Sequence, residues 1–315
     1  MLNDHSLTPR ERGLLTRWVE TGTLKGDPQL APPPRTFAKG WKIGKPDAVL
    51  EIPQPFRVPA EGTVKYQYTT VSTDFGEDRW IQAFEIRPTA PQVVHHVLVF
   101  VRYPKDHPRA HEQPRPRGGV EGYFAAMVPG QAAFRFPAGT ARFLPKGAQL
   151  RFQIHYTTNG SATEDQTRIG LVFTQGGKPE HEMRSTGVYN LRLRIPPGKA
   201  HHVVQASRVL PIKARLYGFT PHMHVRGTAF HYLAILPDGT RKTLLEIPRY
   251  DFNWQLHYRL SEPLDLPAGT RIRCTAVFDN STKNPANPDP SQTVRWGNQT
   301  WNEMLIGYVD WHPLK

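Results

Sequence analysis

Proline and glycine interrupt this chain along almost its whole length. There are 31 prolines and 25 glycines among 315 residues, and such frequent breakers suit short strands and turns better than helices. Runs rich in β-branched and aromatic residues lie between the breakers, which is the pattern of strands joined by turns. The sequence therefore predicts an all-β protein, and its length allows one large domain or two ordinary ones.

The strand-like runs fall into two sets. Pro237-Asp238-Gly239 predicts a hairpin turn within the second set. Many short antiparallel strands in two sets favour two β-sandwich domains, which we place at residues 37–183 and 184–315. The first set lies at 64–71, 79–87, 93–102, 148–158 and 168–174, and the second at 187–194, 201–209, 214–219, 227–236, 240–246, 254–258, 271–279 and 304–310.

One short helix is expected at the N-terminus, over residues 7–22. Thr8 is placed to cap it, Pro9 suits the first helical position, and Glu11 completes a capping box with Thr8. We expect its apolar face to pack against another part of the protein; this face carries Leu14, Leu15, Trp18 and Val19. A proline-rich tether follows, so residues 1–36 are predicted to stand apart from the strands.

Composition excludes several classes of protein. The formal net charge is +13, but the lysines and arginines are scattered apart from the short run Arg115-Pro116-Arg117, which argues against a nucleic-acid partner. Cys274 is the one cysteine, so no internal disulfide and no thiolate metal cluster can form. Metal ligands must then come from histidine, methionine or carboxylates. No apolar run is long enough to span a bilayer.

Two neighbouring histidines, His222 and His224, lie in a run expected to be strand. Residues two apart on a strand point to the same side, so both imidazoles can reach one metal ion. Imidazole suits copper, zinc, iron and nickel alike, and an isolated His-x-His is more often an ordinary surface or core pair.

A second group of histidines lies in the first set of strands. His95 and His96 are adjacent, and adjacent residues of a strand point to opposite faces. Both can bind one metal only if the strand bulges, ends or twists there. His155 lies in another apolar strand-like run, and the three imidazoles would make one site.

Met304, in Asn302-Glu303-Met304-Leu305, offers a third ligand for the His222 and His224 pair. A neutral thioether is a poor ligand for zinc or Fe(II) but favours Cu(I). The alternative for Met304 is core packing, which is common for methionine. Glu303 is expected to support the site through hydrogen bonds.

The order His-His, His-Tyr, His-x-His and Glu-Met resembles the catalytic core of the type II copper monooxygenases, the family of peptidylglycine α-hydroxylating and dopamine β-monooxygenases. The resemblance covers residues 37–315, and Gln153 to Tyr156 matches the family's Gln-x-His-Tyr. Bacterial members are the most similar, and some carry an N-terminal cytochrome c domain. The segment at 7–28 resembles the last helix of such a domain without its haem-binding Cys-x-x-Cys-His, so it is either a remnant of that domain or an unrelated docking helix.

The resemblance implies two jelly-roll-like domains facing across a water-filled cleft, with two copper ions per chain. His95, His96 and His155 would hold an electron-transfer copper, and His222, His224 and Met304 a copper that binds O2. The implied reaction hydroxylates an activated C–H bond of a small-molecule substrate, with ascorbate or a cytochrome c as electron donor. A periplasmic or secreted location is expected, although no signal peptide opens the sequence.

The sequence departs from the peptide-specific branch near the second site. Thr220 stands where that branch has an arginine for the substrate's carboxylate, and Ile306 and Tyr308 stand where it has asparagine and tyrosine. Residues 304, 306 and 308 share a face of a strand, so Tyr308 would line the substrate side and Ile306 make it more apolar. Together with Gln153, Tyr308 completes the predicted site, and peptide C-termini are not the expected substrates.

Two other functions fit the same residues. A copper-binding electron-transfer or carrier protein would keep both sites without hydroxylating anything. A mononuclear iron enzyme of cupin type would use His222 and His224 and leave Met304 and the His95-His96 pair without a role.

Overall fold

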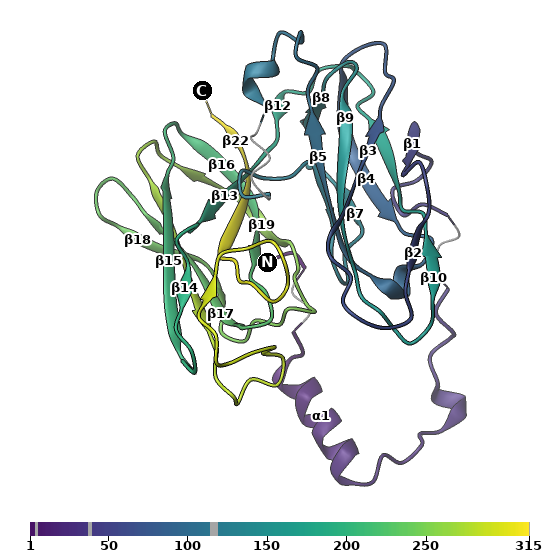
Figure 1. Ribbon diagram of the computed structural model, residues 1–315, viewed down its shortest axis with the longest axis vertical. Coiled ribbons are helices and arrows are strands. Elements are labelled where there is room, and N and C mark those ends of the chain that lie inside the picture. The colour runs from purple at the N-terminus through teal and green to yellow at the C-terminus, as the bar shows by residue number, and fades with distance from the viewer. Residues whose placement is uncertain (4–5, 37–39, 114–118, 315) are drawn as a thin grey trace.

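Strands and turns make up nearly all of the regular structure, as the predicted all-β class requires (Figure 1). The computed structural model describes residues 1–315 except 4–5, 37–39, 114–118 and 315. The run Arg115-Pro116-Arg117 lies outside the described residues.

The first β-sandwich contains the strands between residues 48 and 182. Its strands are β1 (Ala48–Glu51), β2 (Phe56–Val58), β3 (Gln67–Ser72), β4 (Arg79–Arg87), β5 (Val94–Arg102), β6 (Ala125–Met127), β7 (Ala133–Arg135), β8 (Thr140–Leu144), β9 (Gln149–Tyr156), β10 (Thr163–Asp165), β11 (Arg168–Phe173) and β12 (His181–Glu182). One sheet has the order β1-β11-β4-β8-β12 with β7 beside β4, the other has the order β3-β9-β5-β6, and β2 pairs with β10. Buried apolar side chains from both larger sheets share one core.

The second β-sandwich contains the strands between residues 184 and 313. Its strands are β13 (Arg184–Tyr189), β14 (Arg194–Ile195), β15 (His202–Val209), β16 (Ala214–His222), β17 (Gly227–Ile235), β18 (Arg241–Ile247), β19 (Tyr258–Leu266), β20 (Arg271–Phe278), β21 (Val294–Arg295) and β22 (Ile306–Pro313). The sheet β13-β22-β16-β19 packs on the sheet β15-β20-β17-β18 around a second apolar core, and β14 pairs with β21.

Most of the predicted runs coincide with strands. The run at 79–87 is β4, and the predicted hairpin turn joins β17 to β18 with Gly239 at φ 87°. The prediction of a strand at 254–258 is wrong, because 254–257 is irregular and β19 begins at Tyr258. Sequence analysis missed β19 itself, whose Pro263 argues against a strand. Its place at the edge of its sheet explains why proline is tolerated there.

The N-terminal helix α1 (Pro9–Glu20) forms with the predicted caps. Thr8 and Glu11 make the capping box, and Gly22 adopts φ 87° just after the helix. The expectation that its apolar face packs against the protein is wrong for the described residues, since α1 has no buried residue and Trp18 remains 49% exposed. Figure 1 shows α1 below both sandwiches, on the chain that leads to β1. Within the described ranges, no helix is long and apolar enough to cross a membrane.

Buried groups join the two sandwiches. Arg142 of β8 donates to Asp310 of β22 at 3.0 Å, and the hydroxyls of Tyr123 and Thr220 lie 3.1 Å apart. Val120 is fully buried and packs in a small apolar cluster with Met304, Ile306 and Tyr308. The candidate ligands therefore lie near a junction that both halves of the chain build.

Candidate metal centre

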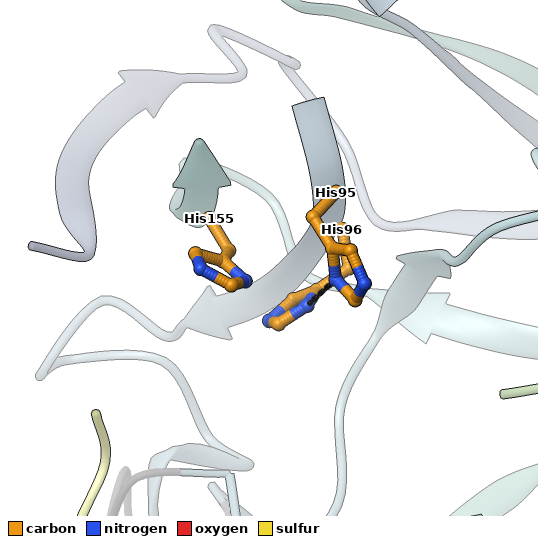
Figure 2. A group of neighbouring side chains, drawn as sticks. All are labelled: His95, His96 and His155. Atoms are coloured by element: carbon orange, nitrogen blue, oxygen red, sulfur yellow. Dashed lines mark hydrogen bonds between the residues drawn. The ribbon is translucent and has the colours of Figure 1, made fainter. Parts of the chain in front are cut away.

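A β-bulge brings the two adjacent histidines of β5 to the same side of the sheet. Val94 pairs with Tyr156 of β9 and His96 pairs with His155, which leaves His95 as an extra residue between the two pairs. Such a bulge is what the sequence requires if His95 and His96 are to bind one metal. Figure 2 shows the rings of His95, His96 and His155 pointing toward one another.

The three imidazoles are close enough to share one ion. Each offers a ring nitrogen, and these nitrogens all lie within 4.8 Å of one another; Nδ1 of His95 is 3.1 Å from Nδ1 of His96. Nδ1 of His155 is buried and has no hydrogen-bond partner among the described residues. A buried nitrogen without a partner is costly unless something binds it, so these residues fit a metal ion.

Hydrogen bonds at the opposite ring positions identify the nitrogens that are free. Nε2 of His95 lies 3.3 Å from Oδ1 of Asn253, and Nε2 of His155 lies 3.3 Å from the hydroxyl of Thr300. An Nε2–H that donates to oxygen leaves the lone pair on Nδ1. Nδ1 is then the nitrogen of His155 that is open to a metal, and the Nδ1 atoms of His95 and His96 lie 3.1 Å apart, close enough to share one ion.

The second histidine set is built where β16 ends. His222 is the last residue of β16 and pairs with Ile306 of β22. Beyond these strands, the backbone N–H groups of His224 and Met304 both donate to the Glu303 carboxylate, which brings the two backbones together. The ring centroids of His222 and His224 are 5.1 Å apart. Nδ1 of His222 is 2.7 Å from Oε1 of Gln255, which leaves its Nε2 for a metal.

In His224, the hydrogen bond made by one ring nitrogen shows which nitrogen is available to a metal. Its Nδ1 lies 3.1 Å from the carbonyl oxygen of Asn302, so Nδ1 carries the hydrogen and Nε2 the lone pair. That Nε2 is buried and, within the described ranges, has no partner. The Nε2 atoms of His222 and His224 therefore also fit a metal.

Glu303 fixes the backbone that carries His224 and Met304. Its buried carboxylate accepts hydrogen bonds from the backbone N–H of His224 at 2.8 Å, of Arg226 at 2.7 Å and of Met304 at 3.2 Å. Burial raises the pKa of Glu303 to about 7, against the lowering effect of these donors and of Arg226. With its oxygens engaged in this way, Glu303 is a support and not a metal ligand.

Burial keeps the histidines in the neutral form that binds metals. It lowers the pKa of His155 to about 3 and that of His222 to about 4, and it lowers the pKa of the other three as well, most strongly for His96 and His224. Neighbouring histidines lower most of these values further. Five neutral imidazoles in an apolar setting are a typical environment for a transition-metal ion.

The two histidine sets lie against each other, contrary to the expected water-filled cleft. The ring centroids of His96 and His222 are 6.4 Å apart. Phe252 enters between the sets; its ring stacks on His95 at 4.5 Å and lies 6.2 Å from His224. The expectation of a cleft is wrong here because the irregular segment before β19 delivers this aromatic side chain into the space.

Gln153 and Tyr308 are the other two predicted site residues. Gln153 lies two residues before His155 on β9, and its amide donates to the hydroxyl of Tyr68 at 2.8 Å. Tyr308 is buried with Met304 and Ile306, as the shared strand face predicts, but Val120 covers it. A cavity of about 410 Å³ lies at another part of the junction, near Arg142, and none of the six predicted ligands lines it.

Sequence analysis missed the residues that hold the histidines in place. These residues are Tyr66, whose ring lies 4.8 Å from that of His155, together with Phe252, Asn253, Gln255 and Thr300. Most of them lie in irregular segments, where no periodic pattern indicates which way a side chain points. Their distance in sequence from the histidines leaves no local motif that could have identified them.

Comparison with known proteins adds little. No family model matches the chain, and no curated protein matches it. Among solved structures, the major capsid protein P2 of bacteriophage PM2 aligns with 85% of this chain and 97% of its own at 11% identity and a TM-score of 0.36. Paenibacillus xanthan lyase aligns with 93% of this chain and 28% of its own at 12% identity and a TM-score of 0.23. Similarity this low carries no argument about activity.

Proposed function

We propose that this chain is a copper-dependent monooxygenase that hydroxylates an activated C–H bond, with O2 and an external reductant. The supporting observation is the pair of facing donor sets, each with a buried imidazole nitrogen that no described residue satisfies: Nδ1 of His155 and Nε2 of His224. In the reaction one oxygen atom enters the C–H bond, the other leaves as water, and the reductant supplies two electrons.

The donor chemistry favours copper over iron and zinc. Three imidazoles alone suit several metals, but a thioether ligand favours Cu(I), and Met304 supplies one on backbone held by the same carboxylate as His224. A non-haem iron site of the two-histidine, one-carboxylate type needs a free carboxylate near His222 and His224. Glu303 is the nearby acid, and three backbone N–H groups occupy its oxygens. The mononuclear iron alternative therefore loses its third ligand.

Bound copper would supply one-electron redox steps and the binding of O2. The residues of the chain orient the imidazoles through Asn253, Gln255 and the Asn302 carbonyl. Phe252 places an apolar ring against His95 and near His224. The face of Met304, Ile306 and Tyr308 is apolar, which suits an apolar substrate once the segment around Val120 makes room.

Recognition of a substrate carboxylate at Thr220 is not part of this proposal. The Thr220 hydroxyl lies 3.1 Å from that of Tyr123 and 2.9 Å from Nδ1 of His257, so it is committed within the protein. Its side chain carries no charge to bind an anion. We expect substrates without a terminal carboxylate at this position.

One observation favours a second candidate, a copper protein that carries electrons or metal and has no substrate. The rings of His96 and His222 lie 6.4 Å apart, Phe252 stacks on His95, and none of the six predicted ligands lines the cavity of about 410 Å³ at the junction. Consumption of O2 separates the two. We expect copper-loaded protein with ascorbate to consume O2 in proportion to an added apolar substrate and to place ¹⁸O from labelled O2 in the product. Reduction by ascorbate with no substrate-dependent O2 uptake would favour the carrier.

A further inference from the structure

One short irregular segment touches both histidine sets. Residues 252–255 lie in the second sandwich between β18 and β19, and their side chains reach His95 and His222 in turn. Asn253 meets His95 of the first sandwich, whereas Gln255 meets His222 of the second. The Phe252 ring stacks on His95 with the two planes 12° apart and lies 6.2 Å from the ring of His224.

The segment is anchored to the first sandwich as well as to its own. The backbone N–H of His257 donates to Oε1 of Gln131 at 3.2 Å, in the turn between β6 and β7. Leu256 is buried beside Gly130 in the same turn. Within the segment, the Gln255 amide donates to the carbonyl of Phe252 at 2.9 Å, and the N–H of Asn253 donates to Asp251. The segment therefore holds one shape while it spans the junction.

We propose that the two histidine sets form one closed binuclear metal centre, and that segment 252–255 is the strap that closes it and aligns both sets. This inference rests on the two metal sites of the proposed function. It departs from the separated sites that the family resemblance implies, because the His96 and His222 rings lie 6.4 Å apart with an aromatic side chain beside them. Electrons would then pass between neighbouring sites without crossing solvent.

Paramagnetic resonance of protein loaded with Cu(II) tests this centre directly. Two distant Cu(II) ions give the sum of two independent spectra, whereas ions in one centre perturb each other through their unpaired electrons. The single-site references are His95→Ala and His224→Ala, each loaded and desalted. We expect wild type with two coppers per chain to depart from the sum of these references and to lose signal intensity relative to it.

Phe252→Ala tests the strap. We expect this variant to keep two coppers per chain while its spectrum moves toward the sum of the two references. Phe75→Ala is the matched control, since Phe75 is also a half-buried ring packed on another aromatic, Phe173, away from the histidines. We expect it to retain the wild-type spectrum. A wild-type-like spectrum of folded Phe252→Ala would overturn the role of the strap.

Asn253→Ala is a second test of the strap, and it does not require the removal of a packed aromatic ring. Asn253 is exposed and belongs to the second sandwich, yet it orients His95 of the first. We expect copper affinity of the first site to fall by about 10–100-fold, the usual effect of losing such a partner. Asn159→Ala, at another exposed asparagine, should leave it unchanged. Equal affinity in both variants would contradict the alignment by segment 252–255.

The outcomes separate this inference from the function on which it rests. Two coppers per chain with a wild-type spectrum equal to the sum of the references would overturn the shared centre and leave the two-copper monooxygenase standing. Fewer than two coppers in wild type would overturn both.

Discussion

His155 and His224 show how single ring nitrogens define the candidate centre. In each ring one nitrogen meets a protein oxygen, and the other is buried without a partner among the described residues. The nitrogen without a partner is Nδ1 in His155 and Nε2 in His224. Leaving such an atom unsatisfied costs roughly 1–3 kcal/mol, so a bound metal is expected to stabilise the fold at both places.

Glu303→Gln tests the support of the second site. An amide in place of the carboxylate turns N–H groups toward backbone N–H donors, which loosens the segments carrying His224 and Met304. We expect Cu(I) affinity of this site to fall by about 10–100-fold while the His95, His96 and His155 site keeps its affinity. Competition titration with a Cu(I) chelator measures both. The control is Glu262→Gln, at a surface position. If Glu303→Gln lowered the copper affinity of both sites equally, Glu303 would not be a specific support of the second site.

Acid should destabilise the metal-free protein before its carboxylates titrate. Burial lowers the pKa of His155 to about 3 and of His222 to about 4, whereas unfolded histidine titrates near about 6.5. The contribution of these imidazoles to the free energy of unfolding is therefore fully present above the pKa of unfolded histidine. It is lost as the pH drops below that pKa, because only the unfolded chain takes up the protons. Each imidazole contributes a loss on the order of 2 kcal/mol by about pH 5.

Urea unfolding of chelator-treated protein between about pH 7.5 and 5 measures this loss. The double variant His155→Ala, His222→Ala should have a flatter pH dependence, and His201→Ala, at a surface position, should follow wild type. A double variant as steep as wild type would show that these imidazoles do not carry the effect.

Residue types and their order were enough to single out His95, His96 and His155, which the structure brings together, and His222 with His224, but not the residues around them. The bulge at His95 could be anticipated because two adjacent histidines cannot otherwise face one metal. Phe252, Asn253 and Gln255 could not, since their role depends on how an irregular connection crosses a junction between distant parts of the chain. The contact between the two sets depends on that connection, whereas the open cleft was an expectation from the family resemblance alone.

At the scale of elements, the candidate site depends on residues at and beyond the ends of strands as well as on the strands themselves. β16 ends at His222, and in the loop that follows the backbone N–H of His224 donates to the same carboxylate, Glu303, as that of Met304. β19 was missed because Pro263 lies in it, and its edge position accounts for this. The helix α1 was predicted with its caps, since capping is local in sequence. What the helix packs against is a tertiary property, and the caps do not reveal it.

A pair of leucine substitutions tests this view of α1. Leu15 is 49% exposed on the helix, whereas Leu216 is fully buried in the second core. We expect Leu15→Ala to change the free energy of unfolding of the isolated chain by no more than about 0.5 kcal/mol. Leu216→Ala should lower it by about 2–5 kcal/mol. Urea denaturation compares them; a large loss in Leu15→Ala would mean that α1 packs on the protein in solution.

At the scale of the whole molecule, the junction between the sandwiches sets the geometry of the centre. Arg142 and Asp310 form an ion pair across it, with both side chains almost completely buried. Arg142 also donates to the carbonyls of Tyr123 and Phe124, so its charge is fixed in place. Removing one member of such a pair leaves a buried charge without its partner.

Asp310→Ala should therefore lower the free energy of unfolding by about 3–5 kcal/mol. The exposed pair of Arg215 and Asp265 supplies the comparison, and Asp265→Ala should have a much smaller effect because water screens that pair. Urea denaturation of the three proteins at neutral pH measures the difference. Equal losses from the two substitutions would show that the junction does not depend on the buried pair.

The most direct test of this account is the copper content of loaded and desalted protein, measured for wild type, His95→Ala and Met304→Ala. The account predicts two coppers per chain in wild type and one tightly held copper in each variant, with a different site lost in each. One copper in wild type, or copper binding that is indifferent to both substitutions, would contradict the two-site centre.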